Sequence, residues 1–170
     1  MITLVLGGTR SGKSDVAETL VAAAPGPVTY VATGRRTDAD MAARIAAHRA
    51  RRPASWTTVE AGSDLPAALA GRAGSVLVDS LGTWVAAHPD LAPDTAALCA
   101  ALRARETDGG GDTVVVSEEV GLGVHAPTDV GRRFADALGA LNRAVADEAD
   151  RVFLVVAGRV LPLDRAPGPI

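Results

Sequence analysis

The chain has 170 residues, of which 48% are apolar and 22% charged, a composition typical of one soluble globular domain. Its 17 basic and 20 acidic residues give a net charge of -3, so the sequence offers no broad cationic surface for a nucleic-acid backbone. No apolar run approaches the roughly twenty residues that a membrane span requires, and the first residues carry no charged leader. We therefore expect a cytoplasmic protein with no nucleic-acid partner and no membrane span.

The first informative motif lies at residues 7–14, GGTRSGKS, which matches the phosphate-binding loop G-x-x-x-x-G-K-[ST]. An apolar run precedes it at Ile2–Leu6, and a segment of helical spacing follows it at Ser14–Ala24. Such a loop gathers backbone N–H groups and a helix N-terminus around phosphate oxygens. The nucleotide-binding residues predicted here are Gly7, Gly8, Thr9, Arg10, Ser11, Gly12, Lys13 and Ser14.

Lys13 is the only lysine among the 17 basic residues, the others being arginine. Its motif position predicts a catalytic role, because a lysine there reaches the β- and γ-phosphates of a bound nucleotide. The next residue, Ser14, would offer its hydroxyl to Mg²⁺. The loop by itself indicates nucleotide binding but does not identify the reaction.

Short apolar runs alternate with alanine-rich, helix-like stretches along the rest of the chain. Four of these runs predict buried strands, at Val28–Ala32, Ser75–Asp79, Thr113–Ser117 and Arg151–Ala157. A weaker run at Thr57–Glu60 adds a strand, and Val160–Leu163 is expected to return as an antiparallel edge. This alternation predicts an α/β fold of the P-loop NTPase type: a three-layer sandwich with a mostly parallel sheet. We expect one domain over residues 1–165 and a flexible tail at 166–170, which is rich in Pro and Gly.

In such a sheet, ligands bind beyond the carboxyl ends of the strands. Polar groups follow several strands there: Ala32, Thr33 and Gly34, then Glu60, and then Asp79. Asp79 ends a strand as a Walker B acid does and would help to hold Mg²⁺; alternatively, it is the N-cap of a helix over Ser80–Ala87. Glu118 and Glu119 are alternative metal or substrate groups, of which we select Glu119 as a metal ligand and a candidate base for the kinase step.

The segment Asp38–Pro53 has the pattern of one helix, with His48 at the boundary between its apolar and basic stripes. One interpretation is a half-buried packing histidine beside a solvated face of arginines. The other is a neutral imidazole, surrounded by guanidinium groups that bind a triphosphate, attacking phosphorus as a nucleophile. The spacing alone leaves both open.

Taken together, these motifs resemble the bifunctional adenosylcobinamide kinase / adenosylcobinamide-phosphate guanylyltransferase family of cobalamin biosynthesis. The resemblance extends nearly end to end. It rests on the phosphate loop, on Asp38-x-Asp40-Met41-x-x-Arg44-Ile45-x-x-His48-Arg49-x-x-Arg52-Pro53-x-x-Trp56-x-Thr58-x-Glu60, on Asp79-Ser80-Leu81, on Ser117-x-Glu119-Val120-Gly121-x-Gly123, and on a last stretch from Arg132 to Asn142. The block around His48 is the most specific part, because it fixes many spacings at once.

The resemblance implies two reactions: phosphorylation of adenosylcobinamide with ATP or GTP, and then transfer of GMP from GTP to the new phosphate, giving adenosylcobinamide-GDP. It implies that His48 becomes guanylylated, and that Arg49, Ala50, Arg51 and Arg52 bind nucleotide with the loop, residues 32–34, Glu60 and Asp79. A chemical argument also supports Glu60 as a guanine-binding residue, because a carboxylate can accept hydrogen bonds from both the N1–H and the N2–H of guanine. A homo-oligomer, specifically a trimer, is implied as well.

Several residues differ from the pattern we associate with the family, notably Glu118 where Asn is common; the others are Asp40, Ala126, Ala135 and Arg143. Most lie in the stretch 118–143, which we expect to contact the corrinoid. The alternatives are a small-metabolite kinase without a covalent intermediate, a nucleotide-dependent regulatory switch, and a recombinase-like DNA motor, which the net charge disfavours. Trp56 and Trp84 are candidates for corrinoid contact, although buried core is the commoner role, and Cys99 is expected to be a buried hydrophobe.

Overall fold

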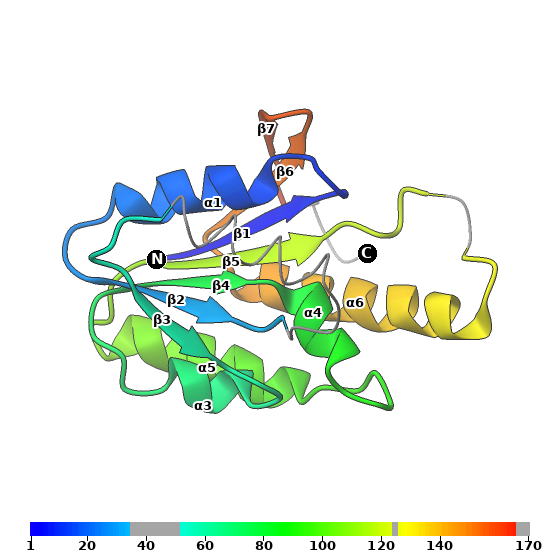
Figure 1. Cartoon of the computed structure of the whole chain (residues 1–170), viewed down its shortest axis with the longest axis horizontal. Helices are drawn as coiled ribbons and strands as arrows, with labels where there is room; N and C mark the ends of the chain where they lie inside the picture. The colour runs from blue at the N-terminus through cyan, green and yellow to red at the C-terminus, as the bar shows by residue number, and fades with distance from the viewer. Residues whose placement is uncertain (35–51, 124–125, 166–170) are drawn as a thin grey trace.

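The computed structural model describes residues 1–34, 52–123 and 126–165. It contains a seven-stranded sheet in the order β3-β2-β4-β5-β1-β6-β7 (Figure 1). The strands are β1 (Ile2–Gly7), β2 (Val28–Ala32), β3 (Thr57–Glu60), β4 (Ser75–Asp79), β5 (Thr113–Glu118), β6 (Arg151–Val156) and β7 (Arg159–Pro162). All neighbouring pairs are parallel except β6 and β7, which pair antiparallel. The predicted α/β sheet with an antiparallel C-terminal edge is therefore confirmed.

Helices lie on both faces of the sheet, as a three-layer sandwich requires. Helix α1 (Lys13–Ala22) covers one face, and α3 (Leu65–Leu69), α4 (Leu81–Ala86), α5 (Thr95–Thr107) and α6 (Asp129–Glu148) pack on the other (Figure 1). The predicted helix at 38–53 and the predicted tail at 166–170 lie outside the described residues, except for Arg52 and Pro53.

Because successive side chains of a strand point to opposite faces, each central strand feeds two cores. In β1, Leu4 and Leu6 join the core beneath α3, α4, α5 and α6, whereas Val5 joins the core beneath α1 with Ala17 and Val21. A strand buried on both faces needs a continuous apolar run rather than an alternating one. This is why the sequence pattern identified the inner strands well.

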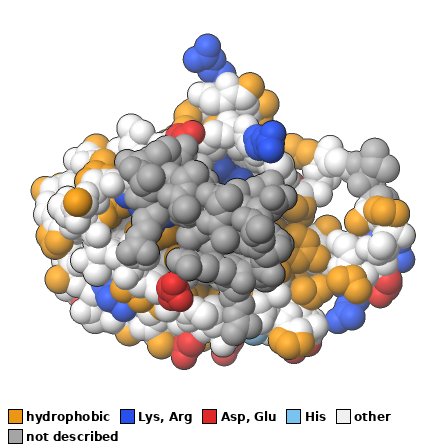
Figure 2. Space-filling view, in the orientation of Figure 1, with side chains coloured by type: hydrophobic (Ala, Val, Ile, Leu, Met, Phe, Trp, Pro, Cys, Tyr) orange, Lys and Arg blue, Asp and Glu red, His pale blue; other side chains and the backbone are white. Residues whose placement is uncertain are grey.

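The two edges of the sheet are more exposed to solvent than its centre. Strand β3 is largely exposed, and the β6–β7 hairpin projects from the body with Val156, Val160 and Leu161 exposed (Figures 1 and 2). The side chains of Cys99 and Trp84, at 7% and 1% exposure, are core residues. For Trp84 this confirms the commoner role, that of a buried core residue. Trp56 is only partly buried and packs against the core beneath α1.

The buried side chain of Arg105 joins α5 to the residues at the amino ends of β4 and β5. At the amino ends, Arg105 of α5 is 5% exposed and donates to Thr113 Oγ1 at 3.1 Å, to the carbonyl of Arg72 at 2.8 Å and to the carbonyl of Gly74 at 2.8 Å. Burial, and then the charge of Arg72, lowers the pKa of Arg105. Its three hydrogen bonds compensate for the cost of enclosing the guanidinium.

Candidate functional site

The phosphate loop runs from the end of β1 into the first turn of α1. Gly12 is the N-cap of α1 with φ of 92°, and Arg10 has φ of 57°, so the chain turns through left-handed conformations to bring its N–H groups around the loop. A side chain at Gly7 would place Cβ 2.4 Å from Ser11 Oγ and 2.8 Å from the carbonyl oxygen of Val155. Gly7 is therefore required for packing as well as for the motif.

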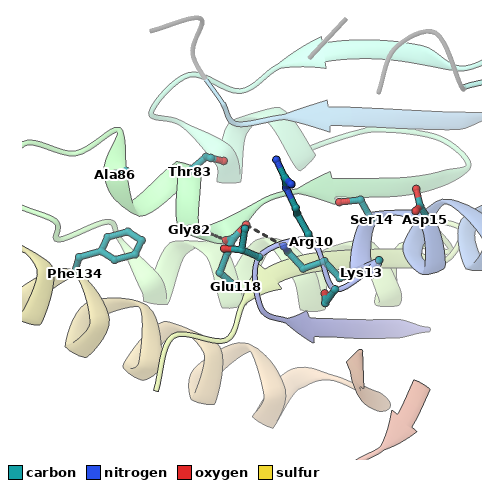
Figure 3. Close-up of a pocket in the computed structure, with 12 residues that line it drawn as sticks. Arg10, Lys13, Ser14, Asp15, Gly82, Thr83, Ala86, Glu118 and Phe134 are labelled. Atoms are coloured by element: carbon teal, nitrogen blue, oxygen red, sulfur yellow. Dashed lines mark hydrogen bonds and ion pairs between the residues drawn. The ribbon is translucent and has the colours of Figure 1, made fainter. Parts of the chain in front are cut away.

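Lys13 lies at the start of α1 with its side chain 12% exposed. Its Nζ lies 3.4 Å from the carbonyl of Gly8, to which it donates, and 3.7 Å from Glu118 Oε1 (Figure 3). The lysine is thus turned back over its own loop, towards the place where a phosphate would bind, and it has a carboxylate as its counter-ion.

Glu118 reaches this place because β5 pairs with β1 in parallel, with Glu118 opposite Gly7. Its two carboxylate oxygens accept from Ser80 Oγ at 2.9 and 3.0 Å, and Oε2 also accepts from the N–H of Gly82 at 3.0 Å. Figure 3 shows this carboxylate lying between Gly82 and Lys13. The acid is therefore fixed at the centre of the site by α4.

These groups line a cavity of about 700 Å³ at the carboxyl ends of the strands. Its wall includes loop and α1 residues 9–15, Glu118, and an apolar part made by Ala86 of α4 and Phe134 of α6. The described wall thus joins a cationic, phosphate-binding part to a part with apolar side chains, and a nucleotide with a second substrate fits this division better than a phosphate alone.

Glu119, which the sequence analysis selected over its neighbour, has a different environment. Its Oε1 accepts from the N–H of Gly121 at 2.6 Å, within its own loop, and its backbone N–H donates to the carbonyl of Gly7. The cavity wall described above includes Glu118 but not Glu119. Adjacent residues at a strand end point to different sides, and nothing in the local sequence pattern indicates which of the two faces the loop.

Asp79 ends β4, which is separated from β1 by β5. Its Oδ2 accepts from the hydroxyl of Tyr30 at 3.0 Å. The alternative that Asp79 caps the following helix is wrong, because Ser80 occupies the N-cap position of α4. The pKa of the Tyr30 hydroxyl is raised by its burial and then by the charge of Asp79, so the phenol keeps its proton and acts as a donor to the carboxylate.

Thr33 follows β2 and is 1% exposed. Its Oγ1 accepts from the N–H of Ser80 at 2.8 Å and lies 2.6 Å from the carbonyl of Ser80, to which it donates. The hydroxyl therefore ties the end of β2 to the start of α4. Ala32 and Gly34 flank it, and Glu60 lies exposed at the end of β3, opposite Ala32 in the parallel register.

Arg52 is the one residue of the predicted basic helix face that the structure describes. Its guanidinium carbon lies 3.2 Å from the centre of the Tyr30 ring, and its Nε lies 3.7 Å from Glu18 Oε1 of α1. The side chain is only 7% exposed. His48, Arg49, Ala50 and Arg51 lie outside the described residues, so their predicted roles stay predictions.

The metal ligands predicted from sequence are Ser14, Asp79 and Glu119. Ser14 lies in the cavity wall, whereas Asp79, at the end of β4, is not among the residues that line the cavity. A hydroxyl and a carboxylate are oxygen ligands of the kind that Mg²⁺ takes in proteins. Within the described residues, no group of three or more His, Cys, Asp or Glu side chains forms a metal-binding cluster. No described helix is long and apolar enough to cross a membrane.

Comparison with known proteins gives the chain its relatives. Residues 3–163 match the family described as cobinamide kinase / cobinamide phosphate guanyltransferase. The chain is 40% identical to the bifunctional adenosylcobalamin biosynthesis protein CobP of Pseudomonas aeruginosa, over 98% of this chain and 99% of that protein. It is 34% identical to CobU of Salmonella typhimurium, which carries the same bifunctional description, over 93% of this chain and 97% of that protein.

A solved structure shares the fold. An ATPase from the type III secretion system of pathogenic bacteria superposes with a TM-score of 0.51 at 12% identity, over 90% of this chain and 50% of that one. This likeness supports the P-loop ATPase fold and nothing more specific. With the full-length sequence matches, it follows that the chain belongs to the cobinamide kinase / cobinamide phosphate guanyltransferase family.

Proposed function

We propose that this chain catalyses two successive reactions on adenosylcobinamide. In the first, the hydroxyl of the substrate takes the γ-phosphoryl group of ATP or GTP. In the second, GMP passes from GTP to that phosphate, giving adenosylcobinamide-GDP and releasing diphosphate. The observation that carries the proposal is the position of Lys13 in a cavity that also has an acid and an apolar wall, in a chain of this family.

For the kinase step, the loop from Gly8 to Ser14 binds the phosphates through its backbone N–H groups, and Lys13 neutralises the charge that develops on the transferred group. Ser14 and Asp79 would hold Mg²⁺, which supplies charge compensation at the phosphates when bound. Phosphoryl transfer asks the protein mainly for alignment and electrostatics, so a fixed loop and lysine supply most of what this step needs.

For the guanylyl transfer, we propose that the imidazole of His48 attacks the α-phosphorus of GTP. A P–N bond forms, the bond to diphosphate breaks, and the phosphate of the acceptor then displaces the histidine. Arg49, Arg51 and Arg52 would offset the negative charge that the imidazole approaches, with Ala50 and residues 32–34 alongside the nucleotide. The carboxylate of Glu60 would accept hydrogen bonds from the N1–H and N2–H groups of guanine. The trimer implied by the family resemblance belongs to this proposal as well and is checked by light scattering.

The experiment is a labelling assay with α-³²P GTP and Mg²⁺ on the purified chain. We expect label on the denatured protein that acid releases, base preserves and peptide mapping assigns to His48. The variant His88→Ala is a matched control, because His88 follows α4 and its Nδ1 lies 2.9 Å from the carbonyl of Trp84 in a local contact. An unlabelled protein that nevertheless binds GTP would favour the alternative of a small-metabolite kinase without a covalent intermediate.

A further inference from the structure

We propose that Glu118 is a catalytic residue with two successive partners in the kinase step: Lys13 in the nucleotide-free site, and the acceptor hydroxyl once a triphosphate has taken the lysine. This inference rests on the proposed function and adds to it the residue that receives the acceptor. It concerns a residue at which this chain has an acid where the family resemblance leads us to expect Asn.

The first observation is that α4 holds the Glu118 carboxylate while α6 holds the backbone of Glu118. Ser80 Oγ and the N–H of Gly82 donate to the carboxylate from the start of α4. Behind it, Asn142 of α6 accepts from Ser117 Oγ at 2.5 Å and donates Nδ2 to the carbonyl of Glu118 at 3.0 Å. An acid fixed by α4 and α6 is pre-organised to bind another group at its remaining lone pairs.

The second observation is the place of this carboxylate in the cavity. In Figure 3, Glu118 lies between the loop, where Lys13 and Ser14 are drawn, and the apolar side chain of Phe134. A triphosphate on the loop would present its γ-phosphoryl group near Lys13. A large acceptor lying along the apolar wall would then bring its hydroxyl to the boundary between the two parts, where Glu118 lies.

The reaction balances with these groups alone. The acceptor O–H donates to the Glu118 carboxylate while its oxygen attacks the γ-phosphorus of the nucleoside triphosphate. The new O–P bond forms, the bond from the γ-phosphorus to the bridging oxygen breaks, and the nucleoside diphosphate leaves. The hydroxyl proton passes to the carboxylate and then to solvent.

The third observation concerns Lys13, whose Nζ lies 3.7 Å from Glu118 Oε1. A triphosphate must take the lysine away from this partner, and it also brings negative charge towards a carboxylate. Glu118 therefore weakens nucleotide binding while it assists transfer. If Glu118 only maintained the fold, its replacement would weaken ATP binding and lower kcat together. If it also receives the acceptor hydroxyl, its replacement strengthens ATP binding and lowers kcat.

The test is Glu118→Gln, which keeps the size of the side chain and removes its charge. We expect ATP to bind about threefold more tightly, as the loss of a partly exposed competing ion pair implies. We expect kcat for phosphorylation of adenosylcobinamide to fall about 10²-fold, the scale of a lost proton acceptor. GMP labelling from α-³²P GTP should be no lower than in the unchanged chain. Glu106→Gln is the matched control, since Glu106 is exposed and lies within 3.8 Å of the chain's amino terminus at the other end of the sheet.

Two results would overturn the proposal: a kcat for Glu118→Gln within twofold of the unchanged chain, or ATP binding and kcat that weaken together. Failure of the proposed function has a different signature, because the unchanged chain itself would then transfer no phosphate to adenosylcobinamide. In that case the assignment of Glu118 would fall with it.

Discussion

The N–H of Gly82 donates to Glu118 Oε2 at 3.0 Å, and a side chain at Gly82 would place Cβ only 2.1 Å from the same oxygen. A side chain at this position would therefore displace the carboxylate, and the reason is this contact and not the backbone angles of Gly82. The start of α4 and the end of β5 are thereby joined beside the phosphate loop.

From this contact we expect Gly82→Ala to push the Glu118 carboxylate out of its place without changing any charge. Phosphoryl transfer should fall about tenfold or more, because misplacing a positioned group by about 1 Å has large effects on rate. The measurement is kcat for adenosylcobinamide phosphorylation. Gly139→Ala on α6 is the matched control: nothing lies within 4 Å of its added Cβ, so it should raise helix stability by about 0.5–1 kcal/mol. Unchanged kcat in Gly82→Ala would contradict this account.

Replacing Lys13 by Ala should impair both reactions. Each step develops negative charge at a phosphorus bound by the same loop, and loss of one charged stabilising group there costs about 10²-fold or more in rate. Steady-state phosphorylation and GMP labelling, measured on protein of unchanged circular dichroism, check this expectation. Normal activity in either assay would remove the central assignment of the loop.

His48→Ala should abolish GMP labelling and leave measurable phosphoryl transfer, because only the guanylyl step needs a nucleophilic imidazole. The two assays are run on one preparation with α-labelled and γ-labelled GTP. Loss of both activities in a folded variant would refute this division of labour between His48 and the loop.

Thr33→Val should lower the free energy of unfolding by about 1–3 kcal/mol, because it removes two hydrogen bonds between buried groups at about 0.5–1.5 kcal/mol each. The N–H and carbonyl of Ser80 would lose their contacts with Thr33 Oγ1, and both Thr33 and Ser80 are buried. Urea unfolding measures the change, and Thr33→Ser, which keeps the hydroxyl, should recover most of it. An unfolding midpoint equal to that of the unchanged chain would show that β2 and α4 do not depend on this contact.

Arg105→Met should destabilise the fold by about 2–6 kcal/mol, because it leaves the acceptors at Thr113 and Arg72 without this donor, at about 1–3 kcal/mol for each unpaired buried group. The carbonyl of Gly74 would keep the N–H of Gly111 as its donor. Thermal unfolding with Arg103→Met as the control separates this from a general arginine effect, since the Arg103 side chain is 54% exposed and pairs with Glu148 at the surface. Equal stability losses in the two variants would contradict the role given to Arg105.

The sequence by itself determined the sheet and the phosphate loop. Strands β2, β3 and β4 have the bounds that their apolar runs predict, β1, β5 and β6 each differ by one residue at the carboxyl end, and β7 begins and ends one residue earlier than predicted. Local patterns suffice here, because a strand buried on both faces must be continuously apolar and a phosphate loop must carry its glycines at fixed positions.

Only the tertiary structure decided which polar groups meet. Glu118 and Glu119 are neighbours of the same type, yet Glu118 lies beside Lys13 and Glu119 binds the N–H of Gly121 in its own loop. The pairing of β5 with β1 and the N–H of Gly82 place the Glu118 carboxylate beside the lysine. Likewise, Arg52 packs on Tyr30, whose hydroxyl binds Asp79, a set that brings together residues up to 49 positions apart in the chain. The periodicity of a sequence reports burial along one segment, whereas these contacts depend on how several segments are placed beside one another.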